Sequence, residues 1–351
     1  MKASFVSSSA ISEAMRYSLM KTQVALAKAQ KEQSTGFYAD KGLALGARSS
    51  QSVSFNRELE RIKGIVDSNA IAAMRLSATQ LTLGNISDAA QSFLSVLTTG
   101  LSGNVQSSVI TDSAKDMLST LLSLNTSVAG EYLFAGINTD VRPINDFQDP
   151  ASDNRAAFDA AYQQYLTEPG VDPANPFPTV SDMDKFISQY VEPQFTAAEV
   201  GGSWQNWSKA SDQLIVSRIA LNETVETSVS ANNEGMRKLA MAAVVIGEFL
   251  SMDLNRDVRQ SLVDRAISLV GQAIGDVDKL RSQTGIAEKR VSDASERLSL
   301  QSTLLEKNIL ATEGVEPYEA AARVSDYLSH IETSYAITAR IQQLSLLKFL
   351  S

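Results

Sequence analysis

The amino-acid sequence predicts a mainly α-helical protein. Both chain ends are expected to build a long antiparallel coiled-coil or helical-bundle rod, with a small mixed α/β or β-containing domain inserted between them. Gly and Pro together supply only 26 of the 351 residues, about 7% where ~12% is usual. Seven of the eight prolines fall between Pro143 and Pro193, and proline breaks helix interiors. On both sides of that window, apolar residues recur with the 3.5-residue period of a coiled coil.

The N-terminal side is predicted to form helices. Residues 10–33 carry an amphipathic pattern that includes Leu19 and Leu26. A longer helix is expected from a cap at Ser54 to a stop at Gly100, and another over residues 108–129. The heptad positions of the long helix are Leu59, Ile62, Val66, Asn69, Ala73, Leu76, Gln80, Leu83, Ser87, Ala90, Leu94 and Leu97.

The C-terminal side carries a longer heptad series. Gly314 followed by Pro317 predicts the end of that helix and the start of a last one, because Gly ends helices and Pro fits the first helical position. The series runs through Val263, Ala266, Val270, Ala273, Val277, Leu280, Thr284, Ala287, Val291, Ala294, Leu298, Gln301, Leu305 and Asn308.

These patterns predict three domains. Residues 1–45 with 317–351 form a terminal helical pair, residues 46–136 with 235–316 form the rod, and residues 137–234 form the insert. Apolar residues continue to the last positions of the chain, so the two ends are expected to pack on each other or on other subunits.

Composition excludes several classes of site. The formal net charge of −9 argues against nucleic-acid binding, which needs a basic surface. The absence of cysteine removes disulfides, thiolate metal sites and cysteine nucleophiles. His330 is the single histidine and has no partner constellation, so it is expected to be a surface or interface residue. No catalytic residue, cofactor site or metal site is predicted.

Two features of the insert invite a sharper interpretation. Asp182, Asp184 and Glu192 are carboxylates near one another, but no Asp-x-Asp-x-Asp-Gly loop is present, and a solvated helix start capped by Ser181 is favoured. Trp204 and Trp207 are expected to anchor the small core of the insert rather than to stack on sugars.

Neither a membrane span nor a cleaved signal peptide is expected. The N-terminus is polar soon after Lys2, without the apolar run of about 7–15 residues that a signal peptide needs. The most apolar stretch, residues 239–247, ends at Glu248, short of the ~18 residues that a membrane span needs.

Several motifs together resemble the bacterial flagellin family of axial proteins. The segment from Gln33-Ser34-Thr35-Gly36 to Leu45 resembles the N-terminal turn of that family, without the Asp-Asp-Ala-Ala-Gly-Leu run of filament flagellins. The segment from Gly130 to Thr139, followed by Pro143, is similar to the G-x-Y-L-F-G-G-x-x-T signature of hook–filament junction proteins, the hook-associated protein 3 class. Ala135 replaces one of its glycines. Residues 345–350 resemble the ending of that class, with Lys348 in place of an acidic residue. The signature residues are Gly130, Tyr132, Leu133, Phe134, Gly136, Thr139 and Pro143.

The resemblance implies a structural protein without catalysis that self-associates in a helical tubular assembly through an inner-tube domain of terminal helices. Implied partners are another hook-associated protein on the hook side, flagellin on the filament side and an export chaperone at the C-terminal helix. Neither nucleic acid nor membrane is implied. The implied location is the hook–filament junction outside the cell. The residues expected at the subunit interface are Leu19, Leu26, Leu328, Ile331, Ile341, Leu344, Leu347 and Leu350.

Two alternatives stay open at the level of sequence. The chain is a filament flagellin if the 130–139 segment resembles the junction signature only by coincidence. It is a non-flagellar secreted coiled-coil interaction protein if the terminal motifs are coincidental.

Overall fold

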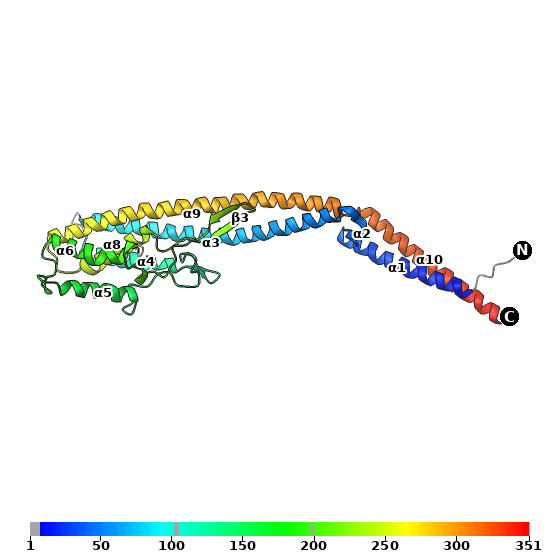
Figure 1. Cartoon of the computed structure of the whole chain (residues 1–351), viewed down its shortest axis with the longest axis horizontal. Coiled ribbons are helices and arrows are strands. Elements are labelled where there is room, and N and C mark those ends of the chain that lie inside the picture. Colours follow the sequence, from blue (N-terminus) through cyan, green and yellow to red (C-terminus); the bar gives the residue numbers. More distant parts are fainter. Residues whose placement is uncertain (1–7, 102–104, 198–199, 351) are drawn as a thin grey trace. The chain divides into compact units, whose positions relative to one another are not determined.

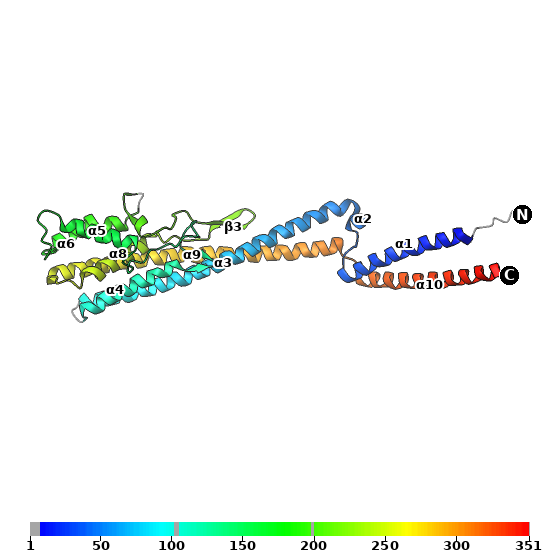
Figure 2. The same ribbon diagram turned by 90° about the horizontal axis from the view of Figure 1, so that it is seen from below.

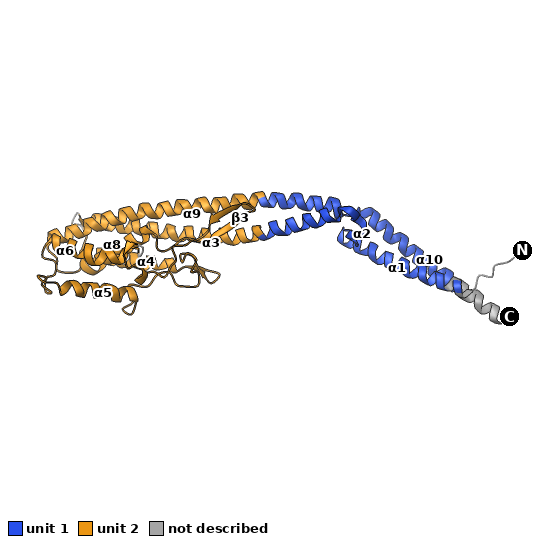
Figure 3. Ribbon diagram, in the orientation of Figure 1, with its two compact units in different colours: residues 1–64, 298–351 blue, residues 65–297 orange. Residues whose placement is uncertain are grey.

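The computed structural model describes residues 8–101, 105–197 and 200–350, with side chains described at residue 10 and, within those ranges, from residue 13 to residue 340. The chain divides into two compact units, shown in Figure 3. Unit 1 comprises residues 1–64 and 298–351, and unit 2 comprises residues 65–297.

Unit 1 contains the two terminal helices. Helix α1 (Ser8–Thr35) and helix α10 (Pro317–Leu350) lie side by side, as Figures 1 and 2 show. The short helix α2 (Lys41–Leu45) and the 3-10 helix η1 (Gly46–Arg48) lead into α3. Pro317 opens α10 and Glu319 lies in its first turn, as the sequence predicted.

Two long helices run through both units: α3 (Ser49–Leu101) and α9 (Arg256–Glu313). In unit 2 they lie side by side and their side chains hydrogen-bond across the seam: the Gln80 side chain donates to the Arg281 carbonyl over 2.6 Å, and Ser87 donates to Asp278 over 3.0 Å. The heptad prediction is confirmed, because none of the predicted positions from Leu59 to Leu97 is exposed.

The predicted positions on α9 behave in the same way, with one exception. From Val263 to Leu298 none is exposed, and Leu305 and Asn308 are half-buried, whereas Gln301 is exposed. The seven-residue repeat therefore continues through Leu305 and Thr312 to the end of the helix at Glu313, with Ser302 and Ile309 less exposed one residue after the predicted Gln301 and Asn308.

Two predicted helix boundaries are wrong. Helix α3 begins at Ser49 rather than after Ser54, whose hydroxyl donates to the Ser50 carbonyl inside the helix. The helix predicted over residues 108–129 is α4 (Ser107–Leu121), and the chain continues through the 3-10 helix η2 (Leu122–Asn125) into strand β1 (Ser127–Val128).

The region from β1 through the insert is small and mixed, as the predicted fold class requires. Strands β1 and β2 (Glu131–Tyr132) form one antiparallel pair, and β3 (Val216–Ala220) with β4 (Glu223–Glu226) forms another. Between the two hairpins come helix α5 (Asp153–Leu166), helix α6 (Val180–Phe186), a π-helical turn η3 (Ile187–Val191), helix α7 (Glu192–Phe195) and the 3-10 helix η5 (Trp204–Asn206).

Aromatic rings of the insert pack against helix α8 (Glu234–Phe249). The centroid of the Phe249 ring lies 5.2 Å from that of the Phe186 ring and 5.5 Å from that of the Phe177 ring. Trp204 and Trp207 are buried and stack with an interplanar angle of 2°, which confirms that they anchor the core. These rings belong to one hydrophobic cluster that also contains side chains of α3, α4 and α9, so insert and rod share a core.

Within the described ranges, no helix combines the length and apolarity needed to cross a membrane.

Candidate functional site

The three insert carboxylates considered for a cation site, Asp182, Asp184 and Glu192, each bind another group of the protein. Among the residues that the structure describes, no group of three or more His, Cys, Asp or Glu side chains is arranged to hold a metal ion. Thr179, not the expected Ser181, caps α6: its hydroxyl accepts from the Asp182 amide, and the Asp182 carboxylate accepts from the Thr179 amide in a capping box. Asp184 and Glu192 both pair with Arg265 of α9.

The terminal helices pair through a seam of their own. On α1 the less exposed side chains follow a 4-3 spacing, and those on α10 do the same, which is the pattern of a short coiled coil. His330 lies outside this seam and is exposed, as expected. The seam residues are Met15, Leu19, Thr22, Leu26 and Ala29 on α1, and Ala320, Val324, Tyr327, Ile331, Ser334 and Thr338 on α10.

The predicted interface residues therefore lie in different environments. Leu19, Leu26 and Ile331 are half-buried within the seam of one chain, whereas Leu328 lies outside it and is 43% exposed. The other four predicted residues belong to α10, but their side chains lie outside the described residues: Ile341, Leu344, Leu347 and Leu350. A role for any of them between subunits stays a prediction.

A second apolar stripe of α1 faces away from the seam. Tyr17, Met20 and Val24 follow helical spacing, and each is more than half exposed. On α10, Leu328 and Tyr335 flank the seam, and the Tyr335 hydroxyl accepts a hydrogen bond from Gln23 over 3.2 Å. Contiguous exposed apolar residues of this kind mark interaction surfaces, so these stripes form the candidate assembly surface.

The 130–139 signature is a tight turn followed by a buried segment. Ala129 and Gly130 both have positive φ, 54° and 87°, as a two-residue hairpin turn between β1 and β2 requires. The Tyr132 amide donates to the Thr139 carbonyl over 2.8 Å. Leu133 and Phe134 are buried in the shared core.

Gly136 allows two backbone segments to approach closely. Its φ is 63°, and a Cβ there would lie 2.4 Å from the Ser211 carbonyl oxygen and 2.5 Å from that of Gln213. The same region joins the incoming and outgoing ends of the insert, because the Ala231 amide donates to the Phe134 carbonyl over 2.7 Å. The signature residues thus fix where the insert leaves the rod.

Asn125 is hydrogen-bonded to the backbone of Ile144, which follows the signature in the chain. Its side-chain amide donates to the Ile144 carbonyl over 3.0 Å, and its oxygen accepts from the Ile144 amide over 2.9 Å. Pro143, the last signature residue, is buried next to it and accepts from the Lys209 amide over 2.9 Å. At the start of the signature, Arg75 of α3 forms an ion pair with Glu131 of β2.

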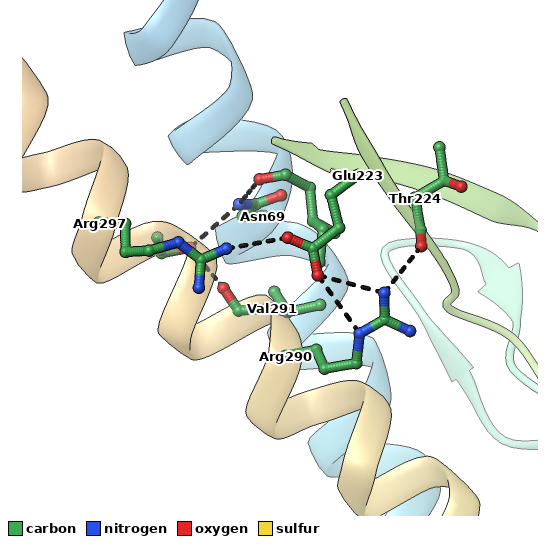
Figure 4. A network of polar contacts seen from close by, with 8 residues as sticks. Asn69, Glu223, Thr224, Arg290, Val291 and Arg297 are labelled. Atoms are coloured by element: carbon green, nitrogen blue, oxygen red, sulfur yellow. Dashed lines mark hydrogen bonds and ion pairs between the residues drawn. The ribbon is translucent and has the colours of Figure 1, made fainter. Parts of the chain in front are cut away.

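The β3–β4 hairpin is bonded to both long helices, as Figure 4 shows. The buried Asn69 of α3 donates to the Ile219 carbonyl over 2.9 Å and to Ser295 over 3.1 Å. Glu223 forms ion pairs with Arg290 at 3.1 Å and Arg297 at 2.9 Å, both on α9.

A buried carboxylate holds the end of α9. The Glu313 side chain has no exposed surface and is bonded to Lys41, Ser52 and Asn56. Burial alone would raise the pKa of Glu313, but the hydrogen bonds from Lys41, Ser52 and Asn56 outweigh it and lower that pKa.

Sequence reasoning did not identify Asn69, Asn125 or Glu313 as structural determinants. Asn69 carried a signal, because it is one of the few polar residues in a mostly apolar heptad series, and buried polar residues need a partner. Asn125 and Glu313 carried none: their partners lie 19 or more residues away in the chain.

The family model of the bacterial flagellin N-terminal helical region matches residues 6–139, and that of the bacterial flagellin C-terminal helical region matches residues 267–350. A solved structure described as a candidate flagellar hook-associated protein from Vibrio parahaemolyticus has a similar fold, with a TM-score of 0.50 and 13% sequence identity over 75% of this chain and 96% of that chain. No individual curated protein matches the sequence.

Proposed function

This chain belongs to the flagellin family, whose N- and C-terminal models together match well over half of it, and from that premise we propose that it is the structural layer joining the flagellar hook to the filament. Membership of that family makes it a structural rather than an enzymatic protein and a component of a self-assembling flagellar polymer.

The observation that supports the junction role is the 130–143 segment. Its hairpin turn, buried Leu133-Phe134 pair and Gly136 close approach set the position at which the insert leaves the rod. A subunit between two different lattices needs its outer part held at a fixed place on its inner part. The signature residues supply that fixed attachment.

Each part of the chain has a proposed role. The terminal pair, residues 1–45 with 317–351, forms the inner tube through the exposed stripes of α1 and α10. The rod, residues 46–136 with 235–316, carries the load between neighbouring subunits. The insert, residues 137–234, faces the outside. Contacts that repeat without closing on themselves produce a helical assembly of this kind.

The proposed partners differ at the two ends of the subunit layer. Another hook-associated protein contacts it on the hook side, and flagellin polymerises on the filament side. An export chaperone covers the C-terminal helix before export through the flagellar type III channel. Export in an unfolded state is compatible with a chain that contains no cysteine and therefore no disulfide.

A second candidate function is that of the filament flagellin itself. Both family models that match are named for flagellin, and self-assembly through terminal helices serves a filament as well as a junction. The two functions differ in copy number and position rather than in fold.

Immunogold labelling of isolated flagella with an antibody against residues 137–234 separates these functions. We expect one narrow band at the hook–filament boundary. Label along the whole filament would instead identify a filament flagellin. Absence of label, with the same antibody binding the purified protein, would contradict a flagellar location. A strain from which the gene is deleted gives the background.

A further inference from the structure

Residues 36–41 link α1 to α2, with Lys41 as the first residue of α2, and form a segment that we name the connector. Gly36 has a φ of +74° and ends α1. The connector then pairs with the turn between α9 and α10: the Tyr38 amide donates to the Glu313 carbonyl over 3.0 Å, and the Val315 amide donates to the Gly36 carbonyl over 2.9 Å. All of these residues belong to unit 1.

The side chain of Glu313 holds the connector from the α9 side. One carboxylate oxygen accepts from the Ser52 hydroxyl and from the Asn56 amide, the latter over 2.7 Å. The other oxygen forms an ion pair with Lys41, at the end of the connector. Glu313 is fully buried, whereas the Lys41 side chain is 49% exposed. A single buried carboxylate thus joins the connector to α3 and α9.

A second carboxylate holds the connector from the α1 side. Glu32 accepts from the Ala39 amide over 3.2 Å and forms an ion pair with Arg323 of α10 at 3.1 Å. Its side chain is only 12% exposed. The two acidic residues therefore hold opposite sides of one short segment.

From this arrangement we propose that the connector is an acid-sensitive latch: the charged Glu313 carboxylate keeps it closed, and proton uptake at Glu313 releases it while the rod remains folded. In its charged form the carboxylate accepts from three donors, and hydrogen bonds to a charged acceptor are about twice as strong as neutral ones. Once neutral, it has no charge to hold Lys41, whose half-exposed ammonium can turn to water.

The charges around Glu313 make this release local. Among the described residues, Lys41 of α2 is its only ion-pair partner, and α3 contributes the neutral side chains of Ser52 and Asn56. Glu32, across the connector, is balanced by Arg323. Because hydrogen bonds and the Lys41 charge lower the pKa of Glu313, the latch stays closed above the usual glutamate range near 4.3. The latch opens as the pH falls through the lowered pKa of Glu313.

Amide hydrogen exchange of the full chain tests the latch, with Glu313→Gln as a permanently neutral form. At pH 7 we expect the amides of residues 36–41 to exchange about tenfold faster in Glu313→Gln than in the wild type. In the wild type the same amides should lose protection at acid pH, after correction for intrinsic exchange rates. The matched control is Glu306→Gln, which removes an exposed carboxylate of α9 that pairs with Lys63 at 3.0 Å.

Fluorescence of Trp204 and Trp207 reports the rest of the molecule, because both tryptophans lie in unit 2. An unchanged emission spectrum in Glu313→Gln, with faster connector exchange, supports the latch. The latch is overturned if the amides of residues 36–41 exchange as slowly in Glu313→Gln as in the wild type at pH 7. It is also overturned if these amides stay fully protected in the wild type at acid pH.

If Glu313→Gln fails to fold, Lys41→Met provides the same test from the exposed side. It removes the ionic partner and keeps an apolar side chain of similar length over the Phe37 ring, which the Lys41 ammonium approaches to 5.4 Å. Faster exchange of the connector supports the latch, and unchanged exchange overturns it. Neither measurement depends on a flagellar role, so the latch and the junction proposal can fail separately.

Discussion

Asn69 of α3 donates a hydrogen bond over 2.9 Å to the backbone carbonyl of Ile219, a residue 150 positions later in the chain. Both residues are buried, at 1% and 0% exposure. A polar residue in the coiled-coil seam thus attaches a β-hairpin of the insert to the rod.

Asn69→Ala should destabilise unit 2 measurably. The substitution leaves the Ile219 carbonyl buried without this donor, which costs about 1–3 kcal/mol. Urea unfolding followed by Trp204 and Trp207 fluorescence measures the change. Asn85→Ala, at an exposed position of the same helix, is the control and should change the free energy of unfolding by less than ~0.5 kcal/mol. Equal effects of the two substitutions would mean that the bond to Ile219 contributes nothing.

Glu223→Gln should cost much less, even though Glu223 pairs with two arginines. Its partners Arg290 and Arg297 are about half exposed, and exposed ion pairs contribute about 0.2–1 kcal/mol each. The same urea titration in low and high salt checks this, because screening should remove most of the difference. An effect as large as that of Asn69→Ala, and insensitive to salt, would contradict it.

Gly136→Ala and Gly130→Ala form a matched pair at the signature. Both glycines have positive φ, so alanine is strained at either position by about 1 kcal/mol. Only at Gly136 does the new methyl group also collide with backbone, 2.4 Å from the Ser211 carbonyl oxygen. Gly136→Ala should therefore lower the melting temperature clearly more than Gly130→Ala. The reverse order would show that the close approach at Gly136 relaxes without cost.

Alkaline pH should destabilise unit 2 through a buried tyrosine of the insert. Burial, assisted by nearby acidic groups, raises the pKa of Tyr165 to about 12. The unfolded chain ionises near pH 10 while the folded chain stays neutral, so stability is complete below pH 10 and falls as the pH rises toward 12. The total loss is up to ~3 kcal/mol. Tyrosinate absorbance should appear late in the folded protein, and Tyr165→Phe should remove part of the pH dependence. A Tyr165 that ionises near pH 10 without unfolding would refute this.

A chain ending at Gly314 should keep unit 2 folded and lose assembly. Removing α10 takes away the partner of α1, while Trp204, Trp207 and the shared core stay intact. Circular dichroism and tryptophan emission measure the folding of unit 2, and light scattering measures assembly. Loss of cooperative melting would instead make the terminal pair part of the unit 2 core.

In the full chain, Leu328→Ser tests the exposed stripe alone, because it leaves the seam of α1 and α10 unchanged.

The helical part of this fold could be predicted because its determinants are local and periodic. Side chains from Leu59 to Leu97 and from Val263 to Leu298 repeat at the spacing that the packing requires, and Pro317 marks a helix start by its own geometry. Boundaries were harder, because Ser54 is a good cap residue that the helix simply includes. The structural contacts of Asn125 and Glu313 depend on partners that only the folded chain brings together, and no pattern along the sequence announces them.

The pairing of the incoming and outgoing segments at Phe134 and Ala231 limits how this insert can vary. Because the two ends already meet, the length of chain between them has little geometric effect on the rod, and loops within it can lengthen or shorten. The aromatic rings over Phe249 impose a different condition, since any substitute for the insert must still cover that ring with apolar surface. Variation between related chains, or in grafted versions of this one, should therefore be free in length and restricted in the side chains that cover α8.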